Sequence, residues 1–117
     1  MAHPIIGIWA VDIDFEGQHT FVTHAFHADG ILHITADGHA AVAVWEATGE
    51  RTFRMHGTRP IEPEPFQFIG WGYVDGDGEV SDGDSYTGRG DLDIPQPDGS
   101  RATGQVTLVG TRVVFAA

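Results

Sequence analysis

The sequence predicts an all-β fold, an eight-stranded antiparallel up-and-down barrel, and three observations carry the prediction. Gly or Pro interrupts nearly every window long enough to form a helix of average length. Short runs of alternating apolar and polar residues recur along the chain, separated by turn dipeptides such as Asp-Gly. The connections are short, so consecutive strands are expected to pair as a meander, and eight such strands bury their edges best by closing on themselves. A two-sheet sandwich is the alternative, favoured if the Pro-rich segment 59–65 breaks the meander.

Each expected strand is bounded by turn signals. The strands, in order, are Ile5–Phe15, Thr20–Phe26, Ile31–Thr35, Ala40–Glu46, Thr52–Thr58, Phe66–Val74, Ser85–Ile94 and Ala102–Phe115. The connections, in order, are EG (16–17), HADG (27–30), ADGH (36–39), ATGER (47–51), RPIEPEP (59–65), DGDGEVSDGD (75–84) and PQPDGS (95–100). Neither a longer repeat nor a linker divides the chain, so residues 1–117 form one domain.

Period-2 alternation assigns the strand faces. In the first strand Trp9 shares a face with other apolar residues while Asp12 and Asp14 lie opposite, so the Trp9 face points inward. The residues expected inside on the first, seventh and last strands are Gly7, Trp9, Val11, Ile13, Phe15, Tyr86, Gly88, Gly90, Leu92, Gly104, Val106, Leu108, Gly110 and Arg112. Glycine has no side chain to fill a barrel, so the inward glycines predict sharp strand bends or open volume.

Composition bounds the function. The formal net charge is −11, from 17 acidic residues against 6 arginines and no lysine, so binding to nucleic acids or anionic membranes is disfavoured. The chain has no cysteine, which excludes disulfides and thiol catalysis. The amino-terminal residues do not resemble a secretory signal, so a cytoplasmic location is expected. No motif for ATP, NAD or pyridoxal phosphate occurs, no nucleophile elbow surrounds Ser81, Ser85 or Ser100, and no cofactor is expected.

Two separated pieces of sequence suggest a family. Gly7-Ile8-Trp9 opens the first strand, and Arg112 lies in the last. This resembles the signature of the calycins (lipocalins, fatty-acid-binding proteins and avidins), in which an indole packs beneath a cation and closes one end of the barrel. The chain also resembles short lipocalin-like barrels of high-GC bacteria, through those residues and through Phe26–Gly30, Val44–Phe53 and Gly110–Arg112. The resemblance implies a calycin-like barrel, closed by Trp9 and Arg112, with an internal pocket.

Three histidines lie close together in "HTFVTHAFHADG". Phe26 is the better core residue, so alternation places His24 inside and His27 outside, with His19 at the strand entry. His33 and His56 are also expected outside, so the histidines do not converge and no metal site is expected. A neutral imidazole inside an apolar barrel is either a satisfied core group or a general acid/base that contacts a ligand.

Aromatic residues supply the other site candidates. Trp71 and Tyr73 share a face and alternate with glycines; inside, they would stack on a flat ligand, and outside, they would form an exposed dimer interface. Tyr86 and Met55 are expected to line the same cavity as His24. The acidic segment 75–84 partly fits a calcium loop, but Tyr73 falls at the first ligand position and cannot serve, so a loop of Asp-Gly turns is the favoured interpretation.

Three functions follow. The first is binding of a small apolar or aromatic molecule in the barrel cavity, with His24, Met55, Trp71, Tyr73 and Tyr86 as ligand-binding residues. The second is a cofactor-free isomerase, cyclase or dehydratase, with His24, Tyr73 and Tyr86 as catalytic residues. The third is a structural barrel that self-associates through its aromatic face as a homodimer.

Overall fold

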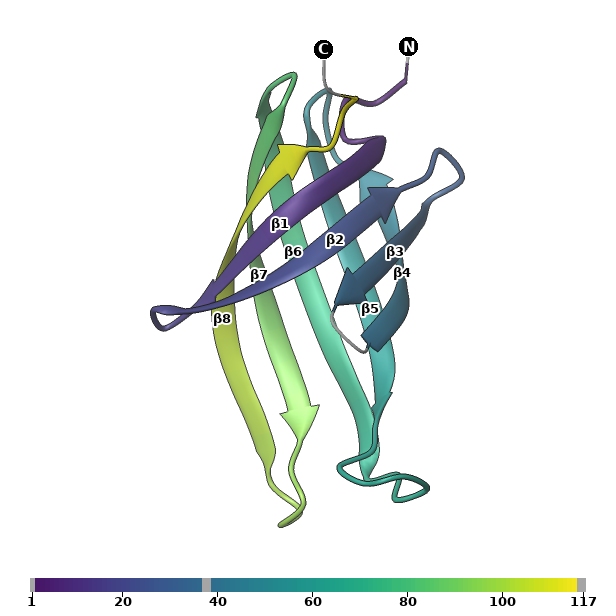
Figure 1. Cartoon of the computed structure of the whole chain (residues 1–117), viewed down its shortest axis with the longest axis vertical. Helices are drawn as coiled ribbons and strands as arrows, with labels where there is room; N and C mark the ends of the chain where they lie inside the picture. The colour runs from purple at the N-terminus through teal and green to yellow at the C-terminus, as the bar shows by residue number, and fades with distance from the viewer. Residues whose placement is uncertain (1, 37–38, 116–117) are drawn as a thin grey trace.

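The chain forms a closed eight-stranded barrel in which every strand pairs with its neighbours in the sequence (Figure 1). The computed structural model describes residues 2–36 and 39–115. The strands are β1 (Gly7–Phe15), β2 (Gln18–Phe26), β3 (Ile31–Ala36), β4 (His39–Ala47), β5 (Thr52–Ile61), β6 (Gly70–Asp82), β7 (Ser85–Pro95) and β8 (Arg101–Arg112). All pairs are antiparallel, and β1 pairs with β8 to close the barrel. The all-β up-and-down barrel is therefore confirmed. No helix in the described ranges has the length and apolar composition needed to cross a membrane.

The sixth strand differs most from the prediction. It runs over Gly70–Asp82 instead of Phe66–Val74, so the segment 75–84 is mostly strand and not the expected loop. The acidic residues of this segment point outward and its glycines point inward, an alternation that the Asp-Gly turn signal conceals. An extended strand cannot wrap around an ion, which removes the calcium-loop interpretation. The expected turn at Asp37-Gly38 lies outside the described residues.

The hairpins at the two ends of the barrel have unequal lengths. The Pro-rich segment does not break the meander, because β5 pairs with β6 along its whole length, from Thr52 with Glu79 to Ile61 with Gly70. The β5–β6 and β7–β8 hairpins reach well beyond the tips of β1–β2 and β3–β4 (Figure 1). β2 pairs with β3 only from Thr23 to Phe26, so the hydrogen-bonded wall is incomplete toward the end of the barrel that lies opposite the chain termini (Figure 1). This end is called the open end below.

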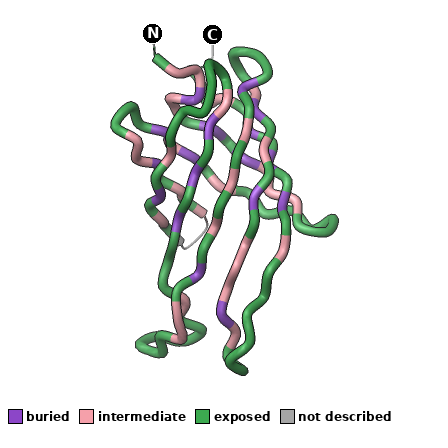
Figure 2. Tube along the Cα trace, turned by 180° about the vertical axis from the view of Figure 1, so that it is seen from behind, coloured by how far each residue is buried: buried purple, intermediate pink, exposed green. Residues whose placement is uncertain are grey.

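The core fills the half of the barrel near the termini. Buried and exposed residues alternate along each strand, as Figure 2 shows. The largest fully buried side chains are Trp9, Tyr86, Phe26, Phe53, Ile5, Leu32, Val11 and Val80. The inward positions of Trp9, Val11, Tyr86, Val106 and Leu108 agree with the alternation read from the sequence.

Several inward glycines are covered by aromatic rings and do not leave the open volume that the sequence suggested. A Cβ at Gly78 would lie 2.7 Å from Cζ of Phe53, and one at Gly110 would collide with the ring of Tyr86. A ring edge of Phe15 occupies the corresponding space at Gly104. The missing side chains thus allow large rings on neighbouring strands to lie directly against the backbone.

Candidate functional site

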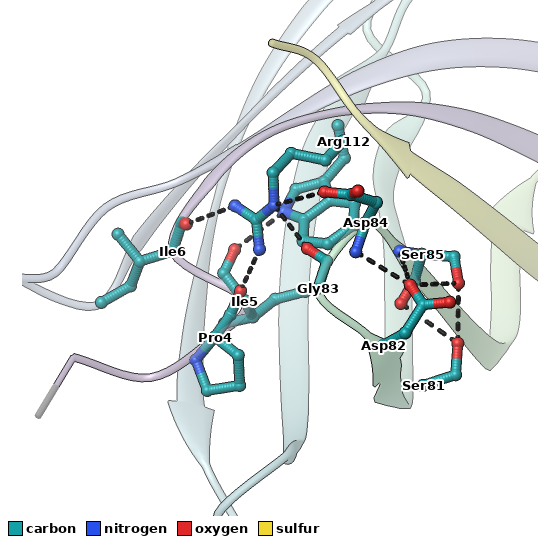
Figure 3. Close-up of polar contacts among 10 residues, drawn as sticks. Pro4, Ile5, Ile6, Ser81, Asp82, Gly83, Asp84, Ser85 and Arg112 are labelled. Carbon is teal, nitrogen blue, oxygen red and sulfur yellow. Dashed lines mark hydrogen bonds and ion pairs between the residues drawn. The ribbon is translucent and has the colours of Figure 1, made fainter.

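The end of the barrel near the termini is closed by Trp9 and Arg112. The Arg112 guanidinium carbon lies 4.3 Å from the centroid of the Trp9 ring, close enough for a cation–π interaction. The same guanidinium donates hydrogen bonds to the carbonyls of Pro4 (2.5 Å), Ile6 (3.1 Å) and Gly83 (2.7 Å), shown in Figure 3. Arg112 therefore ties the amino-terminal segment and the β6–β7 turn to the last strand.

His24 and Tyr86 form a buried polar pair beneath this closure. His24 pairs with Trp9 across β1 and β2, and its Nδ1 shares a hydrogen bond of 2.8 Å with Oη of Tyr86. The two side chains come from strands 62 positions apart in the sequence. They are 2% and 0% exposed. The structure thus brings together two of the three residues for which a catalytic role was predicted.

The surroundings of this pair are apolar and closely packed. The Tyr86 ring makes edge-to-face contacts with Trp9, Phe26 and Phe53, at centroid distances of 5.1 to 6.3 Å. Burial lowers the pKa of His24 from 6.5 to about 4, because the charged imidazolium loses its hydration. Burial raises the pKa of Tyr86 for the same reason. Both groups are therefore neutral near pH 7.

No unpaired polar group marks this region as a ligand anchor. Every buried side-chain nitrogen and oxygen among the residues that the structure describes has a hydrogen-bond partner. Cα partners of His24 on both sides, Trp9 and Ile34, belong to strands that pack closely around it. A satisfied buried pair of this kind contributes to a unique core packing.

The remaining predicted site residues do not join His24 and Tyr86. Trp71 is 49% exposed and Tyr73 is 40% exposed, so both point outward from β6 because the inward positions there belong to glycines. Of the two orientations considered from the sequence, the outward one is observed. Met55 is inside and 5% exposed, packed over Gly76. The five predicted ligand-binding residues thus do not line one cavity.

A small cavity lies inside the barrel toward its open end. Its volume is about 80 Å³. The residues around it are Ile34, Ala41, Val42, Ala43, Gly57, Thr58, Arg59, Gly72, Tyr73, Val74, Leu92 and Ile94. Nine of the twelve are aliphatic or glycine, so the cavity is mainly apolar; the others are Thr58, Arg59 and Tyr73. Of the predicted ligand-binding residues, Tyr73 alone borders it.

A larger hollow crosses the outer face of the barrel. It is an open groove of about 1070 Å³ over strands β4 to β8, and it reaches the end of β1 and the β1–β2 turn. Its side chains include a row of alternating charge across neighbouring strands: Glu46, Arg54, Asp77 and Arg89. Neither this groove nor the apolar cavity is lined by His24 or Tyr86.

The surface histidines form separate pairs. Nδ1 of His19 lies 2.8 Å from Oδ1 of Asp12, which raises the pKa of His19 through that hydrogen bond and the carboxylate charge. Nδ1 of His56 lies 2.5 Å from Oδ1 of Asp75. Within the described part of the chain, no three His, Asp or Glu side chains are placed to hold a metal ion together.

One histidine pair was missed from the sequence. Nε2 of His27 and Nδ1 of His33 are 2.8 Å apart on the outer face of the β2–β3 hairpin. The sequence did contain a signal for this pair, because His27 and His33 were both expected to point outward and lie on the two sides of a short turn.

No protein-family model, curated protein or solved structure matches the chain.

Proposed function

We propose that the barrel binds the apolar part of a small molecule at its open end. The observation that carries the proposal is the apolar cavity between β3 and β7, bounded by Ile34, Ala41, Gly57, Leu92 and their neighbours. A preformed apolar hollow that opens to solvent is the usual location of a ligand in a small barrel.

The size of the cavity limits what would be buried. A volume of about 80 Å³ corresponds to two or three water molecules in the liquid, so it accepts one end of an alkyl chain or a small ring. Pockets that enclose a whole ligand are several-fold larger, about 300 Å³ or more. The rest of the molecule would lie against the inner faces of the longer hairpins β5–β6 and β7–β8 (Figure 1).

The burial of His24 favours binding over catalysis. An acid–base role for His24 would require a substrate to reach a side chain that is 2% exposed and already bonded to Tyr86. Trp9 and Arg112 close the other end, in a way compatible with a calycin-like barrel. Membership in the short lipocalin-like group is part of this proposal, supported by the residues that resemble that group.

A neutral environment-sensitive dye, N-phenyl-1-naphthylamine, provides the test. We expect the fluorescence of the dye to rise when it binds to the wild-type chain. Ala41→Leu fills the cavity and should weaken the apparent affinity for the dye about tenfold. Ala40→Leu is the matched control, because Ala40 is the adjacent residue on β4 and points outward. Equal dye binding by the two variants would place the dye elsewhere and contradict the proposal.

The outward aromatic residues favour self-association as a second candidate. Phe68 and Trp71 are 51% and 49% exposed, with ring centroids 5.5 Å apart, and Phe66 beside them is 99% exposed. Exposed aromatic side chains gathered in one region are typical of protein interfaces. Sedimentation velocity would test this: Trp71→Ser should shift a dimer to monomer, whereas Phe21→Ser, at an isolated exposed ring on β2, should not. A monomeric wild-type chain at high protein concentration would exclude it.

A further inference from the structure

His27 and His33 face each other across the β2–β3 hairpin. His27 directly follows β2, and His33 lies within β3. Their ring nitrogens Nε2 and Nδ1 are 2.8 Å apart, and the ring planes are nearly perpendicular, at 89°. Both side chains are on the solvent-exposed outer face. The hydrogen bond between them uses one imidazole as donor and the other as acceptor.

The backbone holds this pair in place. The amide of His27 donates to the carbonyl of Ile31 (2.9 Å), and the His27 carbonyl accepts from the amide of Gly30 (3.1 Å). The same carbonyl also accepts from Nε1 of Trp45 at 2.8 Å. His33 is fixed by its pairing with Ala25 and Val42 on the two adjacent strands. Only side-chain rotation therefore separates the observed geometry from another arrangement of the two rings.

From this geometry we propose that His27 and His33 chelate a single divalent transition-metal ion. Metal–imidazole bonds of about 2.0–2.1 Å place two neighbouring ligand nitrogens about 2.9–3.4 Å apart for right-angled to tetrahedral geometry. The observed separation of 2.8 Å is just below this range, so the rings need to turn their lone pairs toward a common point with little change in spacing. For both facing nitrogens to bind the ion, the donor imidazole changes tautomer, so that its proton is carried by its other ring nitrogen and each facing nitrogen presents a lone pair. The ion then lies between the two rings, and water completes its coordination.

The choice of metal follows from the ligand chemistry. Imidazole suits Cu²⁺, Ni²⁺ and Zn²⁺, whereas Mg²⁺ and Ca²⁺ prefer oxygen ligands. The net charge of −11 raises the local concentration of any cation. The other bonded surface histidines differ, because His19 and His56 each pair with a carboxylate and not with a second imidazole.

Isothermal titration with Ni²⁺ tests the proposal. The full chain is used with a short amino-terminal extension, so that the terminal amine and His3 cannot chelate the metal together. We expect one ion per chain, and a weakening of at least about tenfold in both His27→Gln and His33→Gln. His19→Gln is the matched control and should bind as the wild type does, and Mg²⁺ should give no isotherm. All three side chains are exposed, so folding of the variants is checked simply by circular dichroism.

Site-resolved evidence comes from Ni²⁺-induced line broadening in NMR spectra. Broadening should begin at residues 27 and 33 and spread to their neighbours on β2 and β3. Unchanged affinity in either variant, or broadening centred on another histidine, would overturn the proposal.

Discussion

Acid should destabilise this barrel through His24. The pKa of His24 is lowered to about 4 in the folded chain by burial, from 6.5 in the unfolded chain. Below pH 6.5 the His24 side chain is protonated in the unfolded chain but stays neutral in the folded chain. The free energy of unfolding therefore decreases as the pH falls from 6.5 toward 4. Below the folded pKa both states are protonated and the loss is complete.

The magnitude follows from the two pKa values. Between pH 7.5 and pH 4.5 the linkage relation gives a loss of about 2–3 kcal/mol in the free energy of unfolding. Such a loss is a large fraction of the stability of a domain of this size, since typical values are about 5–15 kcal/mol. Protonation of His19 acts in the opposite direction, because its pKa is raised in the folded chain, so protonation of His19 stabilises the folded chain.

Urea unfolding followed by tryptophan fluorescence at these two pH values would measure the effect. The comparison variant is His24→Gln, whose amide can still bond to Tyr86 but does not titrate. We expect the wild-type chain to lose about 2–3 kcal/mol more than His24→Gln between the two pH values. Other titrating groups, including His19 and the acidic surface, cancel in this difference. An equal pH dependence in both chains would refute the argument, as would an NMR titration of His24 with a midpoint near 6.5.

Three further predictions concern the packing around this pair, each measured as the change in free energy of unfolding in urea at neutral pH. Tyr86→Phe leaves the buried His24 nitrogen without its partner and should cost about 1–3 kcal/mol; no loss would mean that water replaces the hydroxyl. Gly78→Ala would place a Cβ 2.7 Å from Phe53 and should cost about 1–3 kcal/mol, whereas Gly83→Ala, with no atom within 4 Å, should be nearly neutral. Arg112→Leu removes three hydrogen bonds and the contact with Trp9, and should cost about 1.5–3 kcal/mol; an effect equal to that of Arg89→Leu, on the open outer face, would contradict a closing role.

Much of the fold could be read from the sequence, because alternation and turns are local. The inward positions of Trp9, His24 and Tyr86 follow from period 2 alone. Strand β6 was misplaced because consecutive Asp-Gly pairs are a strong local turn signal. The tertiary context overrides that signal, since Gly78 is required where the ring of Phe53 crosses the strand.

The site was harder to predict because it depends on register. Which residue meets His24 is decided by the closure of β8 onto β1, a contact between the two ends of the chain. The pairings of β1 with β2 and of β7 with β8 then set the positions of His24 and Tyr86. Alternation could place Tyr86 inside but could not bring it to His24. The pair of His27 and His33 could have been predicted from the sequence, because a short hairpin brings outward-pointing residues on its two strands together.

The distribution of glycine helps to explain where the apolar cavity lies among the described residues. Near the termini, inward glycines face aromatic residues, and the rings of Tyr86 and Phe53 occupy the space above Gly110 and Gly78. Beside the apolar cavity the facing side chain is small, because a Cβ at Gly57 would first meet the Cβ of Ala43, at 2.9 Å. Elsewhere at the open end larger groups cover the glycines: Phe15 lies against Gly104 and Ile61 against Gly72. A methyl group cannot extend across the barrel as a phenyl ring does, so the interior beyond it stays unfilled. The apolar cavity therefore lies where glycine is paired with alanine, and enlarging it would require changes at those positions while the aromatic half stays intact.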